Sequence, residues 1–331
     1  MKLGNIPRLR LAYLPTPLQD APRFSEALGG PRILIKRDDL TGFGMGGNKA
    51  RKLEYLLAEA VAEQADTVVT VGGPQSNHCR MTAAAARKLG MQPVLILSGE
   101  PTPHAIGNQL IDRILGAEIV FTGDKDRASV DRVLEDKCPD LRRRGRRPYA
   151  IPRGGSTALG DLGYVGCALE MEQQFFDQGV QPTHIFCATG SCGTHSGLLA
   201  GAVALRANYQ ICGVSVSRPL EQCFERIHRL VSETLELLDV EATLQPEQVI
   251  VYGDYIGPGY AILTPACLEA MHLLAQTEGL ITDPVYTGKA LAGLIDRIRR
   301  GELTAEHTVV FMHTGGKPGV FAYSEAEIGN V

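Results

Sequence analysis

A lysine near the start of this 331-residue chain stands where its amine could act as a nucleophile. Lys49 follows two glycines and an asparagine in the segment GGNKARKLE, residues 46–54, and begins an expected helix. Two further cations, Arg51 and Lys52, lie beside it. Neighbouring positive charge and burial both lower the pKa of a lysine, which leaves more of the uncharged amine. This chemistry needs a carbonyl cofactor within reach, because an isolated lysine in a first helical turn is normally solvated.

A glycine-rich segment, ATGSCGTHSG at residues 188–197, has the composition of an anion-binding turn. Successive backbone N–H groups in such a turn form a concave anion site, to which the positive end of the following helix adds. The segment is either a phosphate site or an ordinary tight connection between a strand and a helix. It lacks the lysine of a P-loop and departs from GxGxxG, which disfavours a nicotinamide cofactor.

A third polar cluster, Ser76, Asn77 and His78, lies in the segment GGPQSNHCRM at residues 72–81. Ser76 could exchange a proton with a substrate, and Asn77 could donate to a hydroxyl group of a cofactor. Either side chain could instead cap the N-terminus of the helix that follows.

The elements that must position these residues alternate between short β-branched runs and segments of helical length, which predicts a doubly wound α/β fold. Most of the runs are apolar throughout, as is typical of parallel strands covered by helices on both faces. The predicted strands are 33–35, 67–71, 94–97, 119–121, 183–188, 211–216, 249–252 and 308–312. The predicted helices are 49–63, 77–89, 161–176, 194–206, 219–240, 265–277 and 288–300.

Three of the strands run directly into glycine-rich turns, at residues 72–73, 190–193 and 315–316. In open parallel sheets, ligands bind beyond the carboxyl ends of the strands. Glycine at these ends permits a positive φ and the close approach of a ligand to the backbone. We therefore expect the three turns to border one polar ligand site.

The composition excludes several classes of protein. With 33 Lys+Arg against 37 Asp+Glu, the net charge of −4 gives no reason to expect nucleic acid or an anionic membrane as a partner. The one basic run, residues 142–147, lies between a helix-like segment and the strand-like residues 149–151 and is expected to be a solvated helix end. We find no apolar stretch with the length of a membrane span or a signal peptide. The 8 cysteines are scattered without a CxxC pattern, which indicates reduced thiols, a cytoplasmic protein and no metal site.

The ordered motifs of the chain resemble those of the pyridoxal-phosphate (PLP) enzymes that include D-cysteine desulfhydrase and 1-aminocyclopropane-1-carboxylate (ACC) deaminase. They run nearly end to end: LPTPL (14–18), IKRDDLTG (35–42), GGNKARKLE (46–54), QSNH (75–78), ATGSCGTHSG (188–197), GPGY (257–260), DPVYTGKA (283–290) and HTGG (313–316). The resemblance implies the two-domain, tryptophan-synthase-β-like fold of fold type II PLP enzymes. It implies a smaller α/β domain at residues 50–153 and a larger PLP-binding domain at 1–49 plus 154–331. It also implies a homodimer that acts on a small amino acid.

Matched residue by residue, the resemblance implies that Lys49 is the Schiff-base lysine and that Asn77 donates to the pyridine 3-hydroxyl of PLP. It assigns the phosphate cradle to five consecutive residues, Gly190, Ser191, Cys192, Gly193 and Thr194.

Four further side chains match positions near the ring or the substrate. Tyr286 matches the tyrosine that stacks on the cofactor, and Thr314 matches the residue that faces the pyridine nitrogen. Ser76 and Tyr260 match side chains near the substrate. Apart from the resemblance, Tyr286 would be interpreted as a buried aromatic residue and Thr314 as a turn-forming hydroxyl.

The residue at the pyridine nitrogen bears on the reaction. A carboxylate there would keep the nitrogen protonated, whereas Thr314 offers only a neutral hydrogen bond and so a weaker electron sink. A weaker electron sink suffices when thiolate leaves the substrate, but the opening of a cyclopropane ring offers no such leaving group. ACC deaminases carry leucine at the position of Thr314 and glutamate at that of Thr287. We therefore expect a carbon–sulfur lyase that converts D-cysteine to pyruvate, sulfide and ammonia, with L-cysteate sulfo-lyase and ACC deaminase as alternatives.

Cys79 and Met81 depart from the desulfhydrase pattern, in which Val and Gln are expected, and either change could alter the substrate pocket. Two alternatives from other classes are a Rossmann-type oxidoreductase and a PLP-binding protein without catalysis. The oxidoreductase alternative predicts an acidic residue at the end of the strand after the glycine turn. Here the strand at 211–216 is followed by Ser217 and Arg218.

Overall fold

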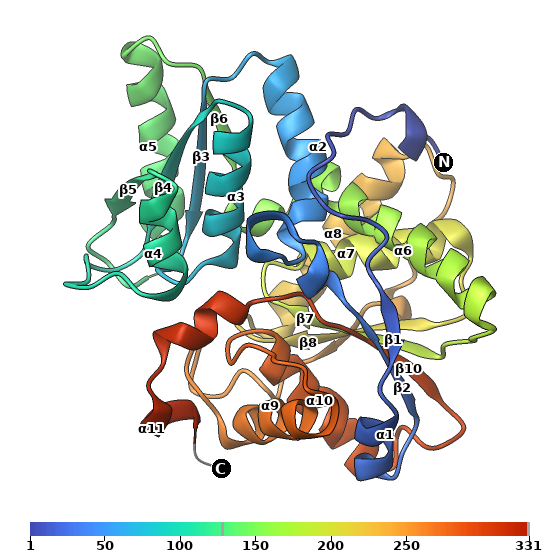
Figure 1. Ribbon diagram of the computed structural model, residues 1–331. Coiled ribbons are helices and arrows are strands. Elements are labelled where there is room, and N and C mark those ends of the chain that lie inside the picture. Colours follow the sequence, from blue (N-terminus) through green and yellow to red (C-terminus); the bar gives the residue numbers. More distant parts are fainter. Residues whose placement is uncertain (127–128, 330–331) are drawn as a thin grey trace.

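The computed structural model describes residues 1–126 and 129–329 and contains two sheets with helices packed on them (Figure 1). The six-stranded sheet has the order β1-β2-β10-β7-β8-β9, and the four-stranded sheet has the order β5-β4-β3-β6. In the larger sheet the strands are β1 (Leu18–Asp20), β2 (Arg32–Lys36), β7 (His184–Thr189), β8 (Gln210–Ser215), β9 (Ile250–Tyr252) and β10 (Thr308–Met312). In the smaller sheet they are β3 (Thr67–Gly72), β4 (Gln92–Leu97), β5 (Glu118–Phe121) and β6 (Pro148–Ile151).

Strand pairing is parallel in both sheets except between β1 and β2, which pair antiparallel. The helices that cover the sheets are α1 (Pro22–Leu28), α2 (Lys49–Ala62), α3 (Asn77–Lys88), α4 (Gly107–Ile114), α5 (Ser129–Arg143), α6 (Ala158–Gln178), α7 (Gly193–Leu205), α8 (Leu220–Leu237), α9 (Pro265–Glu278), α10 (Thr287–Arg299) and α11 (Glu325–Ile328). The doubly wound α/β fold with parallel sheets is therefore confirmed.

Each predicted strand and helix is present, with ends that differ by only a few residues. The helix-like and strand-like segments on either side of the basic run are α5 and β6. The elements that the sequence patterns did not predict are β1, α1, α4 and α11, which are short. The smaller sheet takes its strands from residues 67–151, and the larger sheet takes its strands from either side of that segment. The exact domain boundaries, 49/50 and 153/154, stay a prediction.

The predicted surface and interior features agree with the structure. The arginines of the basic run at 142–147 are exposed at and beyond the end of α5. All eight cysteines are buried and free. No helix in the described ranges is long and apolar enough to cross a membrane.

A buried ionic network holds the first turn of α2 against the larger sheet. Arg51 donates to both oxygens of Asp38, at 2.9 and 2.8 Å, and to both oxygens of Glu170, at 2.9 Å each. Tyr164 adds a 2.6 Å hydrogen bond to Asp38. Burial alone would raise the pKa of Asp38, but the adjacent Arg51 guanidinium holds that pKa below its usual value. Removing one partner would leave a buried charge unpaired, so the network fixes where α2 begins.

Helix α6 approaches α2 so closely that only glycine fits at the contact. A β-carbon at Gly163 would lie 2.8 Å from the backbone nitrogen of Lys52 and closer still to the carbonyl group of Arg51. Because both neighbours are backbone atoms, they cannot rotate aside. The position of α2, and of the side chains at its start, therefore depends on this contact.

We predict that Gly163→Ala lowers the free energy of unfolding by about 1–3 kcal/mol, as overpacking usually does. Gly166→Ala on the same helix is the matched control, because its new carbon would meet only an Arg8 nitrogen at 4.0 Å. Because alanine has a higher helix propensity than glycine, Gly166→Ala should stabilise the protein by up to about 1 kcal/mol. Urea unfolding followed by circular dichroism measures both changes. Equal effects of the two substitutions would contradict the close contact of α2 with α6.

Candidate active site

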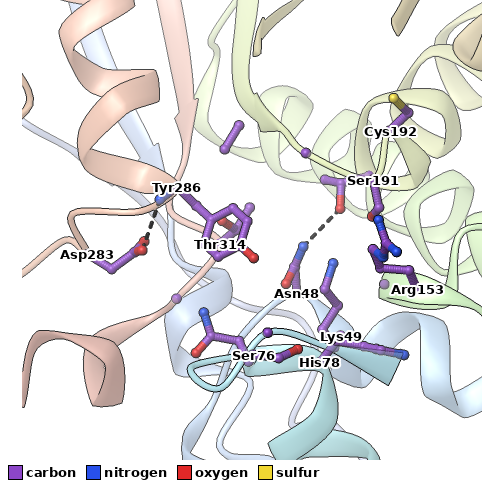
Figure 2. Close-up of a pocket in the computed structure, with 18 of the residues that line it drawn as sticks. Asn48, Lys49, Ser76, His78, Arg153, Ser191, Cys192, Asp283, Tyr286 and Thr314 are labelled. Atoms are coloured by element: carbon purple, nitrogen blue, oxygen red, sulfur yellow. Dashed lines mark hydrogen bonds between the residues drawn. The ribbon is translucent and has the colours of Figure 1, made fainter. Parts of the chain in front are cut away.

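The three glycine turns that the sequence predicted to converge do line one pocket, between the two sheets. They contribute Gly72 at the end of β3 with Gly73 after it, Gly190 beyond β7, and Gly315 beyond β10. Figure 2 shows Asn48 and Lys49 pointing into this pocket, with Tyr286 on one side and Ser191 and Arg153 on the other.

Most of the predicted site residues line this pocket. They are Lys49, Ser76, Asn77, Gly190, Ser191, Cys192, Thr194, Tyr260, Tyr286 and Thr314. Gly193 lies just behind the turn, where its N–H donates to Ser156 Oγ at 3.2 Å.

Four polar residues that line the pocket had no role in the sequence interpretation: Asn48, His78, Arg153 and Asp283. Arg153 follows the carboxyl end of β6, so the rule that located the other turns could have found it. The others stand within quoted motifs but had no assigned role.

Lys49 begins α2 and is partly buried. Burial, assisted by the positive charge of Lys52, lowers the pKa of the Lys49 amine to about 7, although Asp161 opposes the shift. Within the described ranges, no hydrogen bond or ion pair engages this amine. A large fraction of it is therefore uncharged at neutral pH and can attack a carbonyl group.

Lys52 lies beneath the glycine turn in a buried polar cluster. Its amine donates to Gly154 O at 3.1 Å and to Ser156 Oγ at 3.2 Å, and it lies 3.4 Å from Asp161 Oδ1. Burial raises the pKa of Asp161 to about 7, against the effect of Lys52. A β-carbon at Gly193 would lie 2.6 Å from Ser156 Oγ and closer to Lys52 and Asp161, so this position requires glycine.

The turn presents the N-terminus of α7 to the pocket. Cys192 precedes α7 with a φ of +73°, in the left-handed region. Behind the turn, Arg218 Nε donates to Gly190 O and Arg226 Nε donates to Ser191 O, each at 3.1 Å. Helix dipole and cations together make this end of the pocket suitable for an anion.

Tyr286 and Tyr260 form the opposite side. Their hydroxyl oxygens are 2.6 Å apart, and their rings pack edge to face with the ring centroids 5.9 Å apart. A β-carbon at Gly190 would lie 3.3 Å from the Tyr286 ring, so the absence of a side chain at Gly190 lets this ring pack closely against the turn.

Asp283 is held at the start of α10 and is not available to a ligand. Its carboxylate accepts the backbone N–H groups of Val285, Tyr286 and Thr287, each at 2.9 Å, and the Thr287 hydroxyl at 2.6 Å. Thr287 is fully buried in this contact and is not among the lining residues. Thr314 does line the pocket and leaves a neutral hydroxyl there.

At the start of α3, the Ser76 hydroxyl accepts the Cys79 N–H at 3.2 Å, so Ser76 caps the helix. His78 Nε2 lies 2.9 Å from Thr70 Oγ1, and burial together with Lys49 and Lys52 holds the pKa of His78 well below its usual value. The imidazole is therefore neutral.

The two departures from the desulfhydrase pattern, Cys79 and Met81, are fully buried and lie behind the wall of the pocket. They pack behind Gly72 and Gly47 respectively, so any effect on a substrate is indirect.

Comparisons with known proteins identify the family of the chain. The family model described as pyridoxal-phosphate dependent enzyme matches residues 9–315, so the chain belongs to that family. A Pyrococcus abyssi protein named "Putative 1-aminocyclopropane-1-carboxylate deaminase" is 40% identical over 323 residues, 98% of this chain and 96% of that protein. The crystal structure of an ACC deaminase homologue is 39% identical, with a TM-score of 0.91 over 99% of this chain and 97% of the other.

More distant structures share the fold. Escherichia coli diaminopropionate ammonia lyase has a TM-score of 0.67 at 21% identity, over 98% of this chain and 89% of the other. The T.th. threonine deaminase has a TM-score of 0.62 at 22% identity, over 91% of this chain and 92% of the other. The predicted fold type II architecture and the predicted family are both confirmed.

The cofactor is pyridoxal 5'-phosphate, and the pocket has groups that fit each part of it. An uncharged lysine amine fits the aldehyde, the N-terminus of α7 fits the phosphate, and the aromatic side chain of Tyr286 in the pocket wall fits a flat ring.

We predict that the rate at which the apoprotein takes up PLP rises with pH, with a midpoint near 7, because deprotonation of Lys49 produces the reactive amine. Lys52→Met removes the neighbouring cation and should move the midpoint upward. Lys88→Met, on the exposed end of α3, is the control and should leave it unchanged. Stopped-flow absorbance gives the rates. A wild-type midpoint near the usual lysine pKa of about 10.4 would contradict the assignment.

Proposed function

We propose that this PLP-dependent enzyme is a carbon–sulfur lyase that converts D-cysteine to pyruvate, sulfide and ammonia. The observation that carries the proposal is that Thr314 brings a neutral hydroxyl to the pocket, where the described part of the chain leaves no carboxylate unoccupied. Among the described lining residues Asp283 is the one carboxylate, and its oxygens are already occupied at the start of α10. Thr314 then offers the ring nitrogen only a neutral hydroxyl.

Bound PLP withdraws electrons from the α-carbon of an amino acid. A neutral partner at the ring nitrogen makes it a moderate electron sink, which suffices where thiolate is the leaving group. This favours elimination over the opening of an unactivated ring.

We assign the other roles to residues with suitable chemistry. Lys49 would hold the aldehyde carbon and, with its pKa of about 7, accept the proton of the substrate α-carbon. The hydroxyls of Tyr260 and Tyr286, 2.6 Å apart, can deliver a proton to the departing sulfur. Ser76 uses an acceptor lone pair for its cap, so its proton remains available to a substrate.

The cofactor contacts are proposed on the same basis. The phosphate would bind the turn Gly190–Thr194, and the ring would lie against Tyr286. Asn77 would donate to the 3-hydroxyl of the ring.

ACC deaminase is the second candidate, since the similar proteins at about 40% identity carry that name. The two threonines, Thr287 and Thr314, weigh against it, because the ACC deaminase pattern has glutamate and leucine there. L-Cysteate sulfo-lyase is a third candidate, because sulfite could leave by the same elimination.

We predict that the wild type releases pyruvate from D-cysteine while 2-oxobutyrate from ACC stays near background. Thr314→Asp, which replaces the neutral hydroxyl with a carboxylate, should shift the ratio of the two activities towards ACC by roughly ten- to hundredfold, the scale of one charge-assisted hydrogen bond. Assays with D-cysteine, L-cysteine, L-cysteate and ACC, at cofactor occupancy matched by absorbance, measure this. The proposal fails if the wild type opens ACC as readily as it eliminates from D-cysteine.

We further propose a cytoplasmic homodimer. The eight buried, unbridged cysteines are compatible with a reducing compartment. Exposed apolar side chains gather along α4, at Leu110 and Ile114 and at Ile106 just before the helix, with Phe321 on the adjoining turn (Lys317–Ala322). Such a patch is typical of a protein interface.

Sedimentation velocity should give the mass of a dimer for the wild type. Ile114→Glu should shift the population towards monomer, because it buries a charge in the interface, while the circular dichroism spectrum stays unchanged. A wild-type monomer at micromolar concentration would exclude the dimer.

A further inference from the structure

Asn77, at the start of α3, faces a second amide that the motifs did not single out. Asn108, the second residue of α4, is fully buried, and its Nδ2 donates to Asn77 Oδ1 at 2.9 Å. Asn77 lines the pocket, whereas Asn108 does not.

The start of α4 is fastened to the turn before Asn77 by a reciprocal set of hydrogen bonds. Asn108 Nδ2 also donates to Gln75 O at 3.0 Å, and the Asn108 backbone N–H donates to Gln75 Oε1 at 2.8 Å. In return, Gln75 Nε2 donates to Ile106 O at 2.9 Å. Asn108 is thereby held by contacts independent of Asn77.

These bonds determine which end of each amide lies where. The carbonyl oxygen of Gln75 can only accept, so the atom of Asn108 beside it must be the NH₂ group. The same NH₂ group faces Asn77, so the Asn77 atom opposite must be its oxygen. The NH₂ group of Asn77 is therefore the end that remains to donate elsewhere.

We propose that Asn108 is a positioning residue that fixes the amide of Asn77, so that its NH₂ group rather than its carbonyl is offered to the 3-oxygen of PLP. This inference rests on the cofactor contact proposed above for Asn77. A donor stabilises negative charge on the 3-oxygen, whereas a carbonyl in the same place would repel it. Asn108 thus acts on the cofactor without touching it.

The test is a pH titration of the visible absorbance of the PLP-loaded protein. Its midpoint reports the proton shared between the 3-oxygen and the nitrogen attached to the cofactor. Losing a donor to that oxygen makes the proton harder to remove, so the midpoint rises. In Asn108→Asp the new carboxylate cannot donate to the Asn77 oxygen, so the Asn77 amide turns over and its NH₂ group points away from the 3-oxygen. The midpoint of the titration should then rise by about half to one pH unit, the scale of one hydrogen bond.

Gln109→Glu is the matched control. It makes the same amide-to-acid change at a buried neighbour on α4, whose Oε1 accepts from Thr102 Oγ1 at 2.7 Å rather than contacting Asn77. The midpoint should not move. Asn108→Ala removes the donor without adding charge and should give a smaller rise, which keeps the test valid if Asn108→Asp does not fold.

Asn77→Ala separates this inference from the proposed function. Asn77→Ala alone should raise the midpoint, and adding Asn108→Asp to it should cause no further rise. If Asn77→Ala raises the midpoint but neither Asn108 variant does, or if Gln109→Glu matches Asn108→Asp, the positioning role is overturned and the cofactor contact of Asn77 stands. If Asn77→Ala has no effect, that contact and this inference are both wrong.

Discussion

The excess of buried positive charge beside the glycine turn is the constraint on which the rest of the site depends. Lys49 and Lys52 share this region with the carboxylate of Asp161, whose own pKa burial raises to about 7. Such a cluster is unfavourable without a further anion, because desolvated like charges repel. In the proposed binding mode a phosphate at the N-terminus of α7 supplies that anion, while burial, assisted by the charge of Lys52, leaves much of Lys49 uncharged and reactive. In this proposal, affinity for the cofactor and activation of the lysine both depend on the same buried cluster.

The fold maintains this arrangement from a distance. The Arg51 network ties the first turn of α2 to the larger sheet, and Gly163 lets α6 approach that turn. Gly193 lets α7 begin directly over Lys52 and Asp161. The pocket lies where strands of both sheets end, so residues that follow strands of either sheet line it.

Much of this could be predicted from sequence, because apolar parallel strands followed by glycine turns leave few other arrangements. The convergence of residues 72–73, 190–193 and 315–316 followed from one rule about open sheets. The rest depended on long-range contacts that local patterns do not encode. Thr287 stands in a site motif, yet its side chain turns to Asp283. Asn108 lies on an eight-residue helix that the patterns did not predict, and Arg218 and Arg226 reach the turn through hydrogen bonds to its backbone carbonyls.

The central claim is that the pocket binds PLP through Lys49. Borohydride reduction of the PLP-loaded protein, followed by proteolysis and mass spectrometry, tests it most directly, since reduction fixes the cofactor to the lysine that holds it. The account predicts a pyridoxyl group on the peptide that contains Lys49 and none there in Lys49→Ala. A modified Lys52, or a fixed adduct that persists in Lys49→Ala, would contradict it.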